Sequence, residues 1–177
     1  MKVQLVIPSI EYKDSYLVAV SEYQAENLLN YRNLNIKDLE NNFEKYVEDI
    51  KAESKGIGLP KGYVPHSVFW LVDDEGYIGR LDLRHELNEY LKTTGGHIGY
   101  DIRPTRRKQG LGKIILELGL EEAKKMGIKD IVITCDVDNI ASSKIIEANG
   151  GQFIDYTVGS YGDEGKVKKK RFEISLV

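Results

Sequence analysis

Two glycines and a short basic run stand together in the middle of the chain, in a pattern suited to binding phosphate. Gly110 and Gly112 follow three basic residues at 106–108 and lead directly into a helix-patterned segment at 113–126. The first N–H groups of a helix have no partner inside the helix, and the helix dipole favours an anion there. The pattern therefore predicts a phosphate cradle at the turn into this helix.

The spacing of these residues excludes two common nucleotide-binding loops. A dinucleotide fingerprint needs a third glycine where this chain has Ile115, and a P-loop needs a hydroxyl residue where it has Ile114. What remains is the pattern Arg107-x-x-Gly110-x-Gly112 between a strand and a helix. A plain strand-to-helix turn with solvated arginines is the alternative interpretation.

The elements beside this loop must hold it in place. Alternating apolar residues at 98–102 predict a strand that Pro104 ends, and the helix after the loop has Gly127 as its C-cap. A short buried strand at 131–135 follows, which the crossover rule makes parallel to the strand at 98–102. Asn139 or Asp138 then caps a further helix.

The flanking segments supply the remaining elements of the fold. They are an opening strand at 3–7, two helices between 11 and 50, strands at 66–72 and 77–83, a short helical piece at 84–92, and closing strands at 152–158 and 167–176. This order predicts one α/β (α+β) domain over residues 1–177. We expect a single mixed, mostly antiparallel twisted sheet with helices on both faces.

The loop and the order of elements together resemble the GNAT superfamily of N-acetyltransferases. The family's pyrophosphate loop, Arg/Gln-x-x-Gly-x-Gly/Ala, is matched at 107–112, and its motif Asn-x-x-Ala/Ser…Gly-Phe is similar to 139–142 followed by Gly150-Gly151. The resemblance covers nearly the whole chain and is most specific at 95–151, which it makes the cofactor-binding half. It implies a GNAT-like acyl-CoA N-acyltransferase fold, acetyl-CoA as cosubstrate, and direct transfer of the acetyl group to a primary amine.

The resemblance also implies which residues bind acetyl-CoA. Backbone groups of Ile102 and Arg103 would bind the pantetheine arm, which in the family lies between two splayed strands. Asn139 and Ser142 would contact the pantetheine amide and the cofactor tail, and helix capping is the alternative for both. The pyrophosphate would be held by residues of the loop and the first helical turn: Arg107, Lys108, Gln109, Gly110, Leu111, Gly112 and Lys113.

The family's catalytic positions are only partly matched. His97 stands where members often carry a glutamate, and a neutral imidazole with a reference pKa of about 6.5 can serve as base or position a water. A structural histidine that bridges strand and loop is the alternative. Ile146 replaces the tyrosine that protonates the thiolate in many members, so Tyr100 is the expected substitute, although its side chain should face away from that of His97. Glu86 is a secondary catalytic candidate, or part of a solvated helix face.

The amino-acid composition and net charge limit the kinds of binding partner and the cellular location that we expect. A chain of 177 residues with net charge -3 fits a soluble globular domain and disfavours binding to nucleic acid or to anionic membranes. The lone Cys135 cannot form an internal disulfide, and the first apolar run is too short for a signal peptide or membrane span, so we expect a cytoplasmic location. No set of histidine and cysteine residues has metal-ligand spacing, so no metal is expected. At least half of the basic residues at 166–171 are expected on the solvated face of a strand.

The acceptor amine is not identified by the sequence. A small-molecule amine is favoured, and five tyrosines of the expected acceptor walls would suit one unless they belong to the core: Tyr12, Tyr16, Tyr23, Tyr156 and Tyr161. A protein amino group as acceptor would need an open groove. An acyl-CoA-binding module without turnover is a further alternative. A homodimer is plausible on base rates alone.

Overall fold

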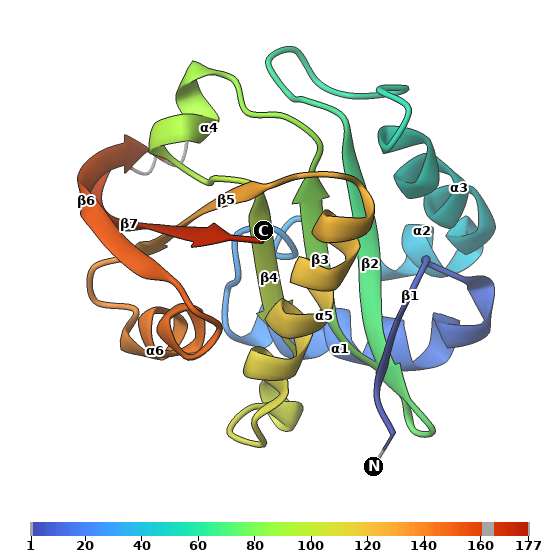
Figure 1. The fold of residues 1–177 in the computed structure, drawn as a ribbon. Coiled ribbons are helices and arrows are strands. Elements are labelled where there is room, and N and C mark those ends of the chain that lie inside the picture. The colour runs from blue at the N-terminus through green and yellow to red at the C-terminus, as the bar shows by residue number, and fades with distance from the viewer. Residues whose placement is uncertain (1, 161–164, 177) are drawn as a thin grey trace.

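The strands are joined into two antiparallel sheets in the computed structural model, which describes residues 2–160 and 165–176 (Figure 1). The first sheet has the order β1-β2-β3-β4, formed by β1 (Gln4–Val6), β2 (His66–Asp73), β3 (Gly76–Arg84) and β4 (Ile98–Ile102). The second has the order β5-β7-β6, formed by β5 (Asp130–Asp136), β7 (Lys166–Ser175) and β6 (Gln152–Ser160).

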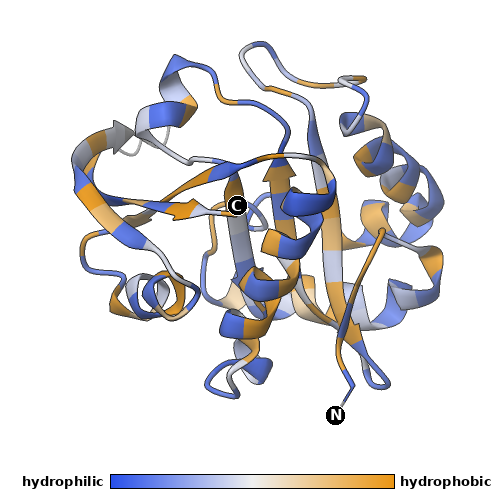
Figure 2. Ribbon diagram, in the orientation of Figure 1, coloured by the Kyte–Doolittle hydropathy of each residue, from blue (hydrophilic) through white to orange (hydrophobic). Residues whose placement is uncertain are grey.

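Helices cover both faces of the first sheet (Figure 1). The helical segments are η1 (Ile10–Tyr12), α1 (Lys13–Ala25), α2 (Ile36–Asn41), α3 (Phe43–Glu53), α4 (Glu89–Thr93), η2 (Pro104–Arg106), α5 (Leu111–Lys125) and α6 (Ile140–Ala148). One apolar core lies between the sheets and α5 with α6, and a second, rich in aromatic side chains, lies between α1–α3 and the opposite face of β2 and β3. Figure 2 shows apolar residues along the strands and, alternating with polar ones, along α5.

Local capping signals determine where several helices begin and end. Asn35 accepts the N–H groups of Lys37 and Asp38 at the start of α2, and Asn88 accepts the N–H of Leu91 at the start of α4. The second expected helix divides into α2 and α3 at Asn42, whose backbone leaves the helical region. None of the helices in the described ranges has the length and apolar character of a bilayer-spanning segment.

The predicted fold class is confirmed, with one correction to the sheet. All ladders among the described strands are antiparallel, and β4 forms no ladder with β5. An isolated bridge between Gly96 and Ile133 joins the two sheets. The reason lies beside this bridge, because the backbone N–H of His97 donates to the carbonyl of Val132 at 2.7 Å while the Val132 N–H donates to the His97 imidazole at 3.0 Å. A side-chain nitrogen here replaces the backbone acceptor that a continuing ladder would need.

Candidate active site

The hydrogen-bond register determines which backbone groups of β4 face β5. Arg103, just after β4, donates its N–H to the carbonyl of Ile78 on the β3 side at 2.9 Å. Backbone groups in an antiparallel ladder face the partner strand at alternate residues. Tyr100 and Ile102 therefore direct their backbone groups away from β3, towards β5.

The same reasoning applies to β5. Val137 donates its N–H to the carbonyl of Lys168 at 3.1 Å, which sets the alternation along the β5–β7 ladder. Thr134 and the N–H of Asp136 therefore face β4, whereas the Asp136 carbonyl accepts the N–H of Asn139 at 3.0 Å. Beyond the contact at His97, the described residues form no ladder across this gap. Buried backbone groups require partners, so the gap suits a ligand that offers amide donors and acceptors.

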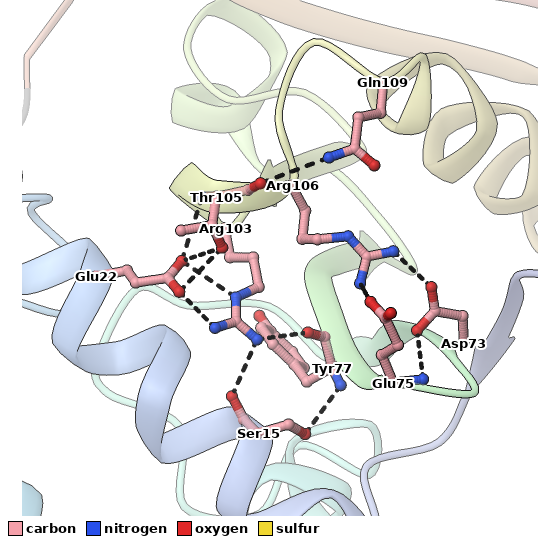
Figure 3. A network of polar contacts seen from close by, with 9 residues as sticks. All are labelled: Ser15, Glu22, Asp73, Glu75, Tyr77, Arg103, Thr105, Arg106 and Gln109. Atoms are coloured by element: carbon pink, nitrogen blue, oxygen red, sulfur yellow. Dashed lines mark hydrogen bonds and ion pairs between the residues drawn. The ribbon is translucent and has the colours of Figure 1, made fainter.

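Arg103 does not share this orientation, contrary to its expected role in binding the pantetheine arm. Its N–H donates to Ile78, and its carbonyl accepts the N–H of Arg106 at 2.9 Å because Pro104 opens a 3-10 turn. Its guanidinium is ion-paired with Glu22 on α1 (Figure 3). Arg103 thus anchors the start of the loop, and Tyr100 and Ile102 are the residues that present backbone to the gap.

The loop before α5 presents a run of free backbone N–H groups. Lys108 and Gly110 both adopt left-handed backbone conformations, with φ of 61° and 79°. Among the described residues, the backbone N–H groups of 108–112 form no hydrogen bond. Those of 111 and 112 belong to the first turn of α5, where N–H groups have no acceptor within the helix. Alternating backbone conformations of this kind form an anion-binding concavity, here at the positive end of the α5 dipole. The geometry fits the pyrophosphate cradle predicted at Lys108, Gln109, Gly110, Leu111 and Gly112.

The arginines beside the cradle are held by acidic residues of other elements. Arg106 pairs with Asp73 at 2.5 Å and Glu75 at 3.1 Å, which ties the loop to the β2–β3 turn (Figure 3). Arg107 donates to the carbonyl of Ile102 at 2.9 Å and pairs with Glu26 at 2.7 Å. Lys113, by contrast, is exposed on the first turn of α5. The backbone cradle is thus available to a phosphate without breaking an ion pair, whereas the guanidinium groups of Arg106 and Arg107 are already paired.

Tyr100 and Ser142 meet at the N-terminus of α6. The two hydroxyl oxygens lie 3.1 Å apart, and burial raises the pKa of Tyr100 to about 12, so that the phenol keeps its proton. Asn139 accepts the Ser142 N–H at 3.0 Å, which is the capping role given as its alternative. Ile146, at the family's tyrosine position, is fully buried in the core and carries no proton to donate.

His97 is partly buried beside this gap, and its ring is already engaged. Burial, reinforced by the nearby positive charge of Arg84, lowers the pKa of His97, so the imidazole is neutral. Because Nδ1 accepts the Val132 N–H, the proton of the neutral ring lies on Nε2. The structure therefore favours the bridging interpretation of His97 and leaves Nε2–H as a donor, not a base. Glu86 is exposed, and no hydrogen bond or ion pair within the described ranges joins it to His97.

Three charged residues that the sequence did not single out have defined roles. Asp101 accepts the hydroxyls of Tyr23 at 2.5 Å and Tyr31 at 2.8 Å, and its desolvation raises its pKa. Lys169, in the run expected to be mainly solvated, is 2% exposed and pairs with Asp136 at 2.6 Å. The third is Arg84. Strand alternation is the signal that would have placed Asp101 on the inner face towards α1.

The four described tyrosines of the predicted acceptor walls do not form one pocket. Tyr16 and Tyr23 are fully buried in the aromatic core, whereas Tyr156 is exposed on the edge strand β6. Tyr12 packs at the margin of the same core, and Tyr161 lies outside the described residues. No group of three or more potential metal ligands occurs in the described ranges.

The fold and the site together define an acyltransferase of the N-acetyltransferase class. A family model described as "Acetyltransferase (GNAT) domain" matches residues 17–152, and the chain therefore belongs to this family. A search of curated protein sequences found no match.

Solved structures share the fold at low identity. A ribosomal L7/L12 α-N-protein acetyltransferase, RimL, in complex with coenzyme A aligns with a TM-score of 0.73 and 15% identity over 99% of this chain and 95% of its own. The microcin C7 self-immunity acetyltransferase MccE, in complex with acetyl-CoA and AMP, aligns with a TM-score of 0.72 and 14% identity over 99% and 93%. An N-acetyltransferase from Staphylococcus aureus Mu50 aligns with a TM-score of 0.65 and 15% identity over the full length of both chains, 100% of each.

Proposed function

We propose that this GNAT acetyltransferase transfers an acetyl group from acetyl-CoA to the primary amine of a small molecule. One observation supports the proposal above others: the facing backbone edges of β4 and β5, which form no ladder with each other among the described residues, lead to a cradle of free N–H groups at the start of α5. An elongated ligand with amide groups at one end and a pyrophosphate at the other matches both features.

Residues of the chain divide the binding of acetyl-CoA between them. Backbone groups of Tyr100 and the backbone N–H of Ile102 bind the pantetheine arm, and the N–H groups of 108–112 bind the pyrophosphate. Lys113 adds positive charge at the same end of the helix. Ser142 contacts the cofactor tail through its hydroxyl, and Asn139 holds Ser142 in place as the cap of α6.

The chemistry requires a neutral amine, a donor to the developing oxyanion and a proton for the leaving thiolate. Acetyl-CoA supplies the thioester carbonyl that the amine nitrogen attacks, and the C–S bond breaks as the C–N bond forms. A gap-facing N–H of β4 donates to the oxyanion, and the Tyr100 hydroxyl, paired with Ser142, donates a proton to the sulfur. The proton released by the amine passes through a water to the Tyr100 phenolate, which so regains the proton that it gave to the sulfur, and Nε2–H of His97 donates a hydrogen bond that holds this water in place.

Thiol release from acetyl-CoA tests this function directly. Wild-type protein would be assayed with amino acids, polyamines, aminoglycosides, arylamines and short peptides, with calorimetric acetyl-CoA binding measured in parallel. Turnover of a small amine supports the proposal, whereas turnover of peptides alone would make the acceptor a protein. Binding without turnover of any amine would favour a binding module. Absence of acetyl-CoA binding would overturn the cradle as a cofactor site.

A further inference from the structure

Strand β3 carries a row of charged side chains on one face. Leu81 and Leu83 point into the core beneath α5. Since side chains alternate along a strand, Arg80, Asp82 and Arg84 lie on the opposite face. This face is the one turned away from α5 and its phosphate cradle.

The charges in this row are not equally balanced. Arg80 pairs with Asp82 through Nε and Oδ1 at 2.8 Å. Arg84 donates Nη1–H to the carbonyl of Gly96 at 3.0 Å, and within the described part of the chain no carboxylate lies within ion-pair distance of its guanidinium. Burial lowers the pKa of Arg84. A partly buried charge of this kind is unfavourable unless a counter-charge reaches it.

Glycines keep the space beside this guanidinium free of side chains. An ideal Cβ at Gly95 would lie 3.9 Å from Nη1 of Arg84, and one at Gly99 would lie 3.9 Å from Nη2. A larger side chain at position 95 or 99 would therefore occupy the space next to the Arg84 guanidinium. The turn after α4 and strand β4 thus place no side chain from positions 95 and 99 against the planar, fork-shaped donor set of Arg84.

Arg84 is also adjacent to the residue proposed to position the reacting water. Its backbone N–H donates to the carbonyl of His97 at 2.8 Å, and its charge helps to keep the His97 ring neutral. A group bound by Arg84 would approach the gap between β4 and β5 from the face opposite to α5. The anion and the reacting amine of one small molecule would then lie close together.

We propose that Arg84 binds the carboxylate of the acceptor, and that the acceptor is a small amine of amino-acid type with its carboxylate close to the amino group. This inference rests on the proposed function. One guanidinium with no ion-pair partner among the described residues balances a single negative charge, and its fork matches the two oxygens of a carboxylate. A phosphate dianion would leave one charge uncompensated at this site.

Matched acceptor pairs test the inference. Each amine turned over would be assayed as the amino acid and as its carboxamide, for example alanine with alaninamide and phenylalanine with phenylalaninamide. We expect the wild type to favour the acids, and Arg84→Gln to raise KM for the acids about 10- to 100-fold while changing KM for the amides less than about 3-fold. Arg84→Lys, which retains the charge without the fork, should lose only part of the preference.

Arg171→Gln is the matched control. The Arg171 guanidinium also holds the 84–97 segment, donating to the carbonyl of Lys92 at 3.0 Å, but it already pairs with Asp155 at 2.6 Å. This variant should retain the wild-type ratio of acid to amide. If Arg84→Gln raises KM equally for acids and amides, or if the wild type prefers amides, Arg84 does not bind the carboxylate of the acceptor. Either result would leave the proposed acetyltransferase activity unaffected. If acetyl-CoA binds but no amine is turned over, the proposed function fails and this inference fails with it.

Discussion

Nδ1 of His97 accepts the backbone N–H of Val132 at 3.0 Å, while the backbone N–H of His97 donates to the carbonyl of Val132 at 2.7 Å. The imidazole thus ends the backbone pairing between the two sheets at the point where the gap begins. The same contact determines the tautomer of the ring and leaves Nε2–H as its only donor. One residue therefore separates the strands and presents a proton donor beside the gap between them.

Replacing His97 should impair turnover more than cofactor binding. We expect His97→Ala to lower kcat about 100-fold, because the positioned water is lost, while the Kd for acetyl-CoA changes less than about 3-fold. Thiol release and calorimetry measure the two effects separately. His66→Gln, on β2, is the matched control and should retain kcat. Wild-type kcat in His97→Ala would exclude any catalytic role for the ring.

The two histidines should have opposite effects on stability as pH changes. The folded-state pKa of His97 is lowered by burial and by Arg84, so its contribution is present above the unfolded pKa of about 6.5 and is lost as pH falls. The folded-state pKa of His66 is raised, first by its contact with Glu53 at 3.0 Å, so its contribution is present below about 6.5 and is lost as pH rises.

Denaturant unfolding from about pH 5 to about pH 8 measures both contributions. His97→Ala should be most destabilising at the high end of this range, and His66→Gln at the low end. Parallel pH profiles for the two variants would contradict this assignment of protonation states.

We expect positions 110 and 112 to require glycine for different structural reasons. Gly110 has φ of 79° and open space around its Cα. An L-residue there costs about 1–2 kcal/mol and turns the cradle N–H groups away, so Gly110→Ala should weaken coenzyme A binding about 5- to 30-fold. Gly110→Asn, which tolerates the left-handed conformation, should recover much of this loss.

Gly112 is the matched comparison. An ideal Cβ there would lie 2.6 Å from Cδ1 of Ile145 on α6, so its glycine serves the packing of two helices. Gly112→Ala should lower the free energy of unfolding by about 1 kcal/mol and change coenzyme A affinity less than Gly110→Ala does. The reverse order of affinities would show that Gly112, not Gly110, shapes the cradle.

Glu26 should compete with the cofactor for Arg107. This pair is partly exposed, with side-chain exposures of 39% for Arg107 and 42% for Glu26, so it is worth about 0.2–1 kcal/mol. Glu26→Gln should therefore strengthen coenzyme A binding about 1.5- to 5-fold, measured by calorimetry. The gain should vanish in an Arg107→Gln background, and Glu75→Gln, which touches Arg106 instead, should show none. A gain that persists without Arg107 would rule out the competition.

Two tyrosine hydroxyls should stabilise the fold through Asp101. Tyr23 and Tyr31 donate to separate oxygens of its carboxylate and stack on each other with ring centroids 4.1 Å apart. Tyr23→Phe and Tyr31→Phe should each lower the free energy of unfolding by about 1.5–3 kcal/mol, because each leaves one oxygen without a donor. Tyr12→Phe is the control and should have little effect. Equal stability of all three variants would mean that the carboxylate finds other donors.

The sequence by itself determined the features that depend on near neighbours in the chain. The alternation at 98–102, the cap at Asn139 and the loop that ends at Gly112 all appear where they were predicted. The C-cap of α5 is Met126, one residue before the predicted Gly127, which follows it in a left-handed conformation. The reason is that strand period, helix capping and left-handed turns are set by residues a few positions apart.

Only the tertiary structure decided what depends on distant residues. The division of the sheet needs Val132 beside His97, and the ion pair of Arg103 needs Glu22 on α1. The burial of Lys169 depends on Asp136, and the availability of Arg84 depends on which carboxylates fold near it. Such contacts join segments tens of residues apart, and their formation is governed by packing and charge balance across the whole fold, which no local pattern reports.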